Sequence, residues 1–253
     1  MEVGYACEGP TDAEPGDGSG SRPEAVEGGS VTSSSDRLIS GLVEDLEPVR
    51  PLPRLRQVFA LVLALWTMLL GGVLWAHAGD AGLLHLFEHP TLEIRVYLAS
   101  FFGLLVASLG GTASALAAGV PGRERLGIAG MALALGGLVA AAVACFVGFH
   151  VLDGSAAAVP AGANAMCFRE GAFFALFPAG VILGFLVRGW TTHPVRAALV
   201  ALLASGALGA LIVHVNCDLY DARHLLLGHL GVPIVFALLG MYPLAVVLRR
   251  VRN

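Results

Sequence analysis

Six long apolar stretches separated by short polar segments dominate the pattern along this chain. Five of them have the length of about 17–25 residues that an α-helix needs to cross a bilayer, and the fourth is shorter unless Phe168 and Gly171 extend it. Backbone groups in lipid must be hydrogen-bonded within the segment, which requires helices. The pattern therefore predicts an all-α, polytopic membrane bundle with six transmembrane helices, at residues 58–76, 96–118, 126–149, 172–187, 197–215 and 230–248.

The first 57 residues have a different pattern. Residues 1–35 are rich in Gly, Ser, Pro, Asp and Glu without apolar periodicity, so we expect a disordered tail. Residues 36–57 begin with apolar residues at helical spacing, which predicts a short amphipathic helix. Its apolar stripe consists of Leu38, Ile39, Leu42, Val43 and Leu46, and its acidic residues are Asp36, Glu44, Asp45 and Glu47.

This amphipathic segment has two interpretations. It could lie on the membrane or on the bundle, or it could dock a soluble partner. Helices that lie on membranes usually carry a basic polar face, whereas the polar residues here are acidic. The acidic face favours a protein partner.

The placement of arginine predicts the orientation in the membrane, because cytoplasmic loops are enriched in basic residues. Ten arginines lie close to the ends of the spans on one side, just before the first span, between the second and third and the fourth and fifth, or after the sixth: Arg50, Arg54, Arg56, Arg123, Arg125, Arg188, Arg196, Arg249, Arg250 and Arg252. The opposite loops, at 77–95, 150–171 and 216–229, hold Arg95, Arg169 and Arg223. We therefore expect both termini in the cytoplasm.

Composition narrows the function classes. Of 253 residues 56% are hydrophobic and 13% charged, the mean hydropathy is +0.76, and the formal net charge of −4 gives no indication of direct nucleic-acid binding. We find no motif of a hydrolase, protease or nucleotide-binding enzyme, so we expect no catalytic activity. The spans hold almost no ionisable residues, which disfavours a small-molecule or metal transporter. A membrane thiol-oxidase should show a CxxC motif, and the sequence has none. A structural membrane subunit is a further alternative.

Candidate chemistry gathers on the outer side, where seven of the eight histidines lie. Cys167 and Cys217 also lie there and have three interpretations. They could form a disulfide between two outer loops, bind a soft metal ion as thiolates, or be unlinked structural residues. A metal site could take auxiliary ligands from His214, His224 and His229. Cys145, inside the third span, is expected to be a core residue.

Three stretches resemble a known family. They are D-R-L-I-S-G-L-V-E-D-L-E-P-V-R-P-L before the first span, C-F-R-E-G at 167–171, and P-V-R-A-A-L-V-A-L-L-A-S-G-A-L-G-A-L-I-V-H-V-N-C-D at 194–218. Together with H-L-G-V-P-I-V-F-A-L-L-G at 229–240, they are similar to the NrsF family of bacterial membrane anti-sigma factors, over about 36–253. The acidic tail has no counterpart in that family.

The resemblance implies a six-span protein of the bacterial inner membrane. It would hold an extracytoplasmic-function sigma factor through the segment 36–57. Family members carry an outer cysteine pair tied to sensing metal or oxidative stress, and those positions correspond to Cys167 and Cys217. A change at this pair would alter the packing of the fourth to sixth spans and release the sigma factor.

Overall fold

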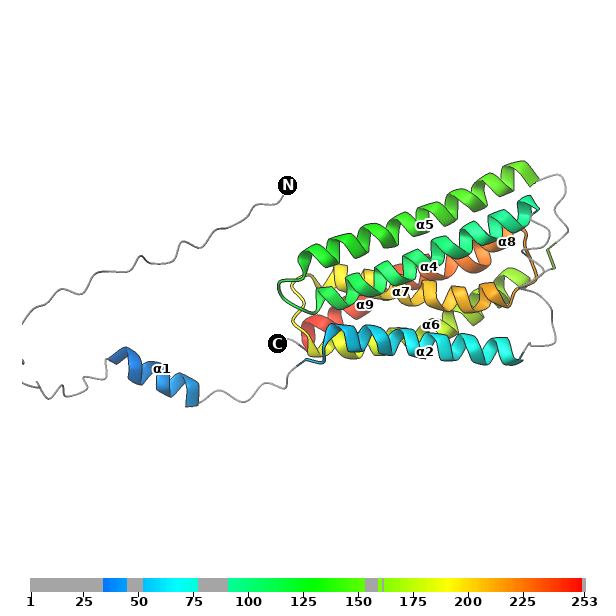
Figure 1. Cartoon of the computed structure of the whole chain (residues 1–253). Helices are drawn as coiled ribbons and strands as arrows, with labels where there is room; N and C mark the ends of the chain where they lie inside the picture. The colour runs from blue at the N-terminus through cyan, green and yellow to red at the C-terminus, as the bar shows by residue number, and fades with distance from the viewer. Residues whose placement is uncertain (1–33, 45–51, 77–90, 153–158, 161, 252–253) are drawn as a thin grey trace, which may run out of the picture. The chain divides into compact units, whose positions relative to one another are not determined.

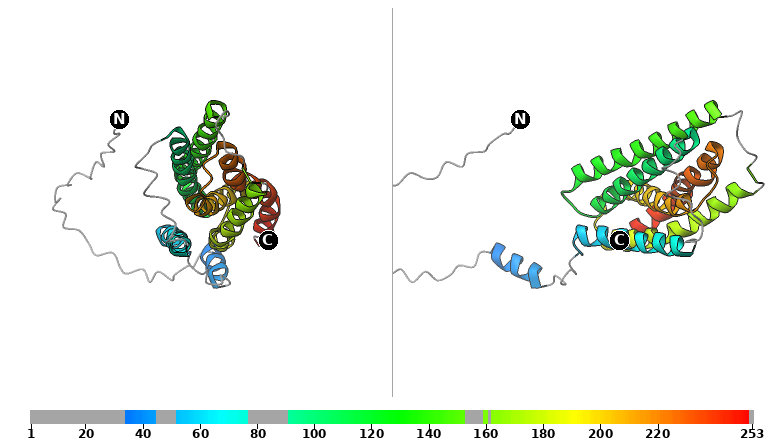
Figure 2. Two further views of the ribbon diagram at one scale, coloured as in Figure 1. Left: turned by 90° about the vertical axis from the view of Figure 1, so that its right-hand side faces the viewer. Right: turned by 45° about the vertical axis from the view of Figure 1, so that its right-hand side comes forward.

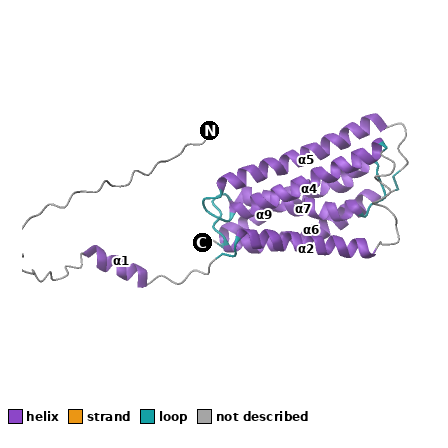
Figure 3. Cartoon of the chain, viewed as in Figure 1, coloured by secondary structure: helices purple, strands orange, loops and turns teal. Residues whose placement is uncertain are grey.

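The computed structural model describes residues 34–44, 52–76, 91–152, 159–160 and 162–251. All regular secondary structure within these ranges is helical, as Figure 3 shows. The chain divides into two compact units, Met1–Arg50 and Pro51–Asn253. The predicted tail lies outside the described residues except for its last two positions, Ser34 and Ser35, which belong to a helix.

The first unit contains helix α1, Ser34–Glu44. Its stripe residues Leu38, Ile39, Leu42 and Val43 are all exposed, with exposed fractions of 57–67%. A helix of 11 residues gains little stability from its own hydrogen bonds in water, and an exposed apolar stripe adds none. Neither its length nor its own packing therefore accounts for the stability of this helix.

The second unit is a bundle of long helices (Figure 1). Six helical segments among the described residues are long and apolar enough to cross a bilayer, which confirms the predicted fold class. The helices are α2 (Leu55–Ala76), α4 (Leu92–Ala118), α5 (Glu124–Leu152), α6 (Ala163–Arg188), α7 (Pro194–Val215) and α9 (Gly231–Arg250). Two short elements, α8 (Ala222–His224) and the π-helix η1 (Leu225–Leu230), lead directly into α9.

The helices extend further than the apolar stretches that predicted them. The fourth was expected at 172–187, yet α6 begins at Ala163, so residues 163–171 are helical rather than an outer loop. The sixth was expected at 230–248, yet continuous helical structure begins at Ala222. Polar residues such as Arg169 and Arg223 lower the hydropathy of these turns without interrupting the helix.

Helix α7 forms the centre of the bundle. In its most apolar stretch 83% of the residues are buried, compared with 11% in α2. It packs against α4, α6 and α9, and the end-on view in Figure 2 shows it enclosed by its neighbours. The indole Nε1 of Trp66 on α2 donates a hydrogen bond to the Leu208 carbonyl of α7, at 3.0 Å.

Glycines allow the closest helix contacts. A Cβ on Gly209 of α7 would collide with the Gly171 carbonyl of α6, and one on Gly206 would lie 2.5 Å from Cα of Pro233 in α9. A Cβ on Gly110 of α4 would lie 2.7 Å from the Gly130 carbonyl of α5. Such small-residue contacts are typical of membrane bundles, where packing drives helix association.

The outer surface of the bundle is apolar. Val139, Val143 and Phe146 on α5 are 55–60% exposed, and Leu239 on α9 is 74% exposed. Large apolar surfaces of this kind are unusual in soluble monomers and are expected where helices face lipid. The bundle is therefore that of a multi-pass membrane protein, with Cys145 fully buried as expected.

Candidate functional site

Four side chains that can ligate metals meet at the end of the bundle where α6 begins and α7 ends (Figure 1). The ligand atoms of Cys167, Cys217, His224 and His229 all lie within 4.8 Å of one another. Cys167 lies in the second turn of α6, Cys217 follows α7, His224 ends α8, and His229 lies in η1. We call these four residues the Cys–His cluster.

The two sulfur atoms of the cluster are close but not bonded. Sγ of Cys167 lies 3.9 Å from Sγ of Cys217, and both cysteines are free and half-buried. A disulfide would require the sulfurs to approach by about 1.9 Å. Burial raises the pKa of the Cys217 thiol to about 12, although a hydrogen bond with the Leu219 backbone acts in the opposite direction. Cys217 is therefore a protonated thiol at neutral pH.

The two imidazoles of the cluster are fully buried and face each other. Nε2 of His224 lies 3.3 Å from Nε2 of His229 and 3.3 Å from Sγ of Cys217. Nδ1 of His224 lies 2.7 Å from Oδ1 of Asn164, in the first turn of α6. When Nδ1 donates a hydrogen bond to that oxygen, Nε2 presents its lone pair to the cluster. A partner of this kind commonly orients a metal-binding histidine.

Local structure holds the imidazoles in place. Asp221 caps α8, because its Oδ1 accepts a hydrogen bond from the His224 backbone N–H at 2.9 Å. A Cβ added to Gly228 would lie 3.3 Å from Cε1 of His224 and 3.5 Å from Cβ of Cys167. Gly228 therefore lies in direct van der Waals range of both the His224 ring and Cys167 of α6, and a side chain here would press most closely on His224.

His214 lies next to the cluster but outside it. From its position in the sequence it was expected to be an auxiliary ligand, together with His224 and His229. Its ring instead stacks on Tyr97, with centroids 4.2 Å apart, and its Nε2 lies 3.1 Å from the Tyr97 carbonyl oxygen. The ring also meets that of His229 edge-on at 5.0 Å, so His214 supports the cluster from α7 without joining its ligand atoms.

The residues predicted to dock a partner are only partly described. Asp36 and Glu44 lie in α1 together with the exposed stripe. Leu46, Asp45 and Glu47 lie outside the described residues, as do the outer histidines His77, His85 and His89.

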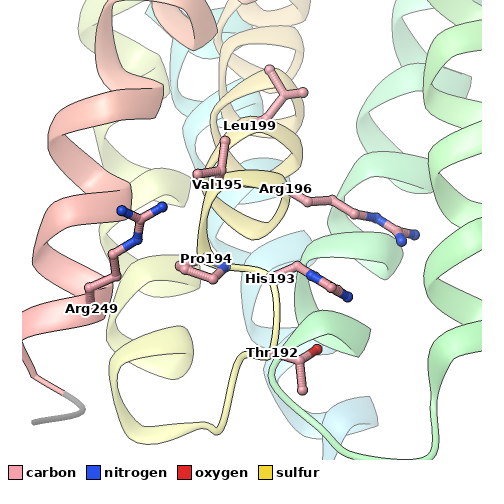
Figure 4. A pocket seen from close by; sticks show the side chains of 7 residues that line it. All are labelled: Thr192, His193, Pro194, Val195, Arg196, Leu199 and Arg249. Carbon is pink, nitrogen blue, oxygen red and sulfur yellow. The ribbon is translucent and has the colours of Figure 1, made fainter.

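A pocket of about 950 Å³ opens at the opposite end of the bundle, where α7 begins and α9 ends. His193, Arg196 and Arg249 contribute to its lining. In Figure 4 the guanidinium groups of Arg196 and Arg249 lie on opposite sides of the first turn of α7, so they do not converge on one point. The pocket therefore lies at the arginine-rich end of the bundle, and the Cys–His cluster lies at the other end of the same helices.

Comparison with known protein families decides the classification. Residues 42–249 match the model of the NrsF family, described as negative regulator of sigma F. The chain belongs to the NrsF family. The match includes the bundle up to the penultimate residue of α9 and the last three residues of α1, and it begins at Leu42, a stripe residue. Comparisons with curated proteins and with solved structures give no match.

Membership in the NrsF family gives the function in coarse form. The family description makes its members negative regulators of a sigma factor, and it implies a sigma factor as partner. The matched region contains all four residues of the Cys–His cluster, so the cluster belongs to the part of the chain that defines the family.

The roles of three residues that shape the site were not predicted from the sequence. Asp221 had a signal, because an Asp three residues before His224 is typical of a helix cap. Gly228 and Asn164 had none, since their roles depend on contacts of α6 with α8 and η1, between residues about 60 positions apart in the chain.

Proposed function

We propose that this chain is an anti-sigma factor of the bacterial inner membrane that binds an extracytoplasmic-function sigma factor through α1 and the residues that follow it, up to residue 57. The observation that carries the proposal is the family match together with the exposed apolar stripe of α1. In this account the chain is a binding protein rather than an enzyme, and its outer cysteine pair controls release.

The stripe suits recognition of the helix-in-groove type. Leu38 and Leu42 are one helical turn apart, and so are Ile39 and Val43, which gives the i, i+4 spacing of groove-binding helices. Their exposed fractions of 57–67% leave most of each side chain free to be buried by a partner. Burial of the stripe would provide the main favourable free energy of docking.

The acidic residues would provide selectivity. Sigma factors bind promoter DNA, so their surfaces offer basic side chains that contact phosphates. Asp36 and Glu44 in α1, with Asp45 and Glu47 after it, would face such basic groups. An acidic helix that occupies them would compete with DNA, and complementary charge would also increase the association rate.

The distribution of charge supports the proposed orientation. The arginine-rich end of the bundle includes the first turn of α5, the last turn of α6 and the last turn of α9. Basic loops are retained in the cytoplasm, which would put the N-terminal segment on the side where a sigma factor is found. The Cys–His cluster would then face the periplasm, an oxidising compartment.

Helix α6 connects the Cys–His cluster to a close contact between α6 and α7. Cys167 lies one turn before Gly171, whose carbonyl touches Gly209 of α7. A disulfide that pulls Cys167 toward Cys217, or a metal ion that draws the four ligand atoms closer than their present separations of up to 4.8 Å, would shift this tight contact. Neither glycine has a side chain that could absorb the change. We propose that this shift alters the presentation of α1 and releases the sigma factor in response to metal or oxidative stress.

Co-purification tests the proposal. The full-length protein, a form without residues 1–33 and a form without residues 1–50 would be solubilised from the native host's membranes. A sigma factor should accompany the first two forms and not the third, because only the third lacks α1. Equal amounts of each form in the membrane fraction are the control for insertion. If no form retains a sigma factor, the anti-sigma role is wrong.

A further inference from the structure

The Cys–His cluster has the dimensions of a tetrahedral metal site. Zinc binds thiolate sulfur at about 2.3 Å and imidazole nitrogen at about 2.0–2.1 Å, so a tetrahedron has edges of about 3.8 Å between two sulfurs, about 3.3 Å between two nitrogens and about 3.6 Å between sulfur and nitrogen. The corresponding distances here are 3.9, 3.3 and 3.3 Å. Three edges of the tetrahedron are thus already formed by the protein.

The π-helix η1 explains how both imidazoles reach this site. His224 and His229 are five residues apart, and in an α-helix such residues point in directions that differ by about 140°. A π-helix has an i→i+5 hydrogen-bond repeat, which brings residues five apart onto one face. Residues 225–230 form such a turn, which starts directly after His224 and includes His229, and Nε2 of each histidine lies 3.3 Å from that of the other.

We propose that Cys167, Cys217, His224 and His229 together bind one tetrahedrally coordinated, zinc-like transition-metal ion, and that the π-turn of η1 exists to complete this ligand set. The inference deepens the proposed function and rests on it, because it names the chemical class of the signal. Two thiolates and two imidazoles suit borderline and soft ions and disfavour magnesium and calcium. Binding of a divalent ion replaces the two thiol protons, so two protons leave for each ion bound.

Asn164 is a positioning residue in this site. Its Oδ1 lies 2.7 Å from Nδ1 of His224 and fixes the tautomer that leaves Nε2 available to the metal. Loss of such a partner typically weakens metal affinity about 10- to 100-fold. Asn164→Ala should show this loss with an unchanged tetrahedral spectrum, whereas Asn164→Asp keeps an acceptor oxygen and should restore affinity.

The test is a metal titration of the full-length protein in nanodiscs, reduced with a phosphine and freed of metal with a chelator. Cobalt(II) is the probe, because its visible absorption distinguishes tetrahedral thiolate coordination from octahedral coordination, and zinc(II) should then displace it. We expect one ion per chain and two protons released. His224→Ala, His229→Ala, Cys167→Ser and Cys217→Ser should each weaken binding at least 100-fold.

Two matched variants serve as controls. Cys145→Ala removes a cysteine buried inside α5, and His150→Gln removes an exposed histidine near the end of that helix. Both should bind cobalt as the wild type does. The site is wrong if the reduced wild type binds no stoichiometric cobalt, if the spectrum is octahedral, or if the His224 and His229 variants match the wild type. That last result would leave the cysteines as a thiol pair only.

Sigma-factor retention measured on the same preparations separates this inference from the proposed function. A sigma factor retained by a protein that binds no metal would refute the metal site alone. Tetrahedral metal binding by a protein that retains no sigma factor would leave the site intact and refute the anti-sigma role.

Discussion

The apolar stripe of α1 provides the most quantitative prediction, through the double variant Leu38→Asp with Leu42→Asp. The two side chains are 67% and 61% exposed in the free protein. Complete burial of a leucine contributes about 1.5–3 kcal/mol, so burial of these exposed portions by a sigma factor would contribute about 2–4 kcal/mol in total. Since about 1.4 kcal/mol corresponds to a tenfold change, we expect Kd to rise about 30- to 1,000-fold.

The assay is a binding measurement between the sigma factor identified by co-purification and the full-length protein in nanodiscs. Ser40→Asp is the matched control, because Ser40 is exposed on α1 but lies off the stripe and the variant gains the same type of charge. The control should bind within about twofold of the wild type, as surface substitutions away from an interface usually do. A double variant that also binds within twofold would refute docking through the stripe.

Three further predictions concern the bundle. Gly209→Leu should prevent the close approach of α6 at Gly171 and lower the midpoint temperature of unfolding in detergent, since overpacking typically costs about 1–3 kcal/mol. Trp66→Phe should remove the hydrogen bond to Leu208 and destabilise the bundle by about 1 kcal/mol, measured by the same unfolding assay. The rate of Cys217 alkylation in the reduced, metal-free protein should be low at pH 7 and should rise about tenfold per pH unit up to pH 10, because the pKa of this thiol is raised to about 12. A rate that levels off near pH 9, as for an ordinary thiol, would contradict the raised pKa.

Hydropathy was sufficient to predict the bundle but not the lengths of its helices. The apolar stretch 172–187 reflects the thickness of the lipid core, whereas α6 continues to Ala163 because hydrogen bonding within a helix does not end at the membrane surface. The nine added residues are important, since they include Cys167. The same difference converts the predicted outer loop at 222–229 into α8 and η1.

The candidate site was predictable in part. Cys167, Cys217, His224 and His229 were identified through their position on the outer side, and the family resemblance also pointed to the two cysteines. Their convergence was not predictable, because it depends on a π-turn, and a π-turn has no residue pattern that would distinguish it from an α-helix. His214 was grouped with them as a possible ligand, but the stacking of its ring on Tyr97 was not predictable from the sequence, and it is not among the four ligand atoms that converge.

Inhibition of transcription tests the central claim most directly. The measurement is promoter-specific RNA synthesis by core RNA polymerase and the co-purified sigma factor, with the full-length protein supplied in nanodiscs. The account predicts that the full-length protein suppresses synthesis and that the form without residues 1–50 does not. It also predicts that zinc restores synthesis with the wild type but not with His229→Ala. Equal synthesis with and without the full-length protein would contradict an anti-sigma role.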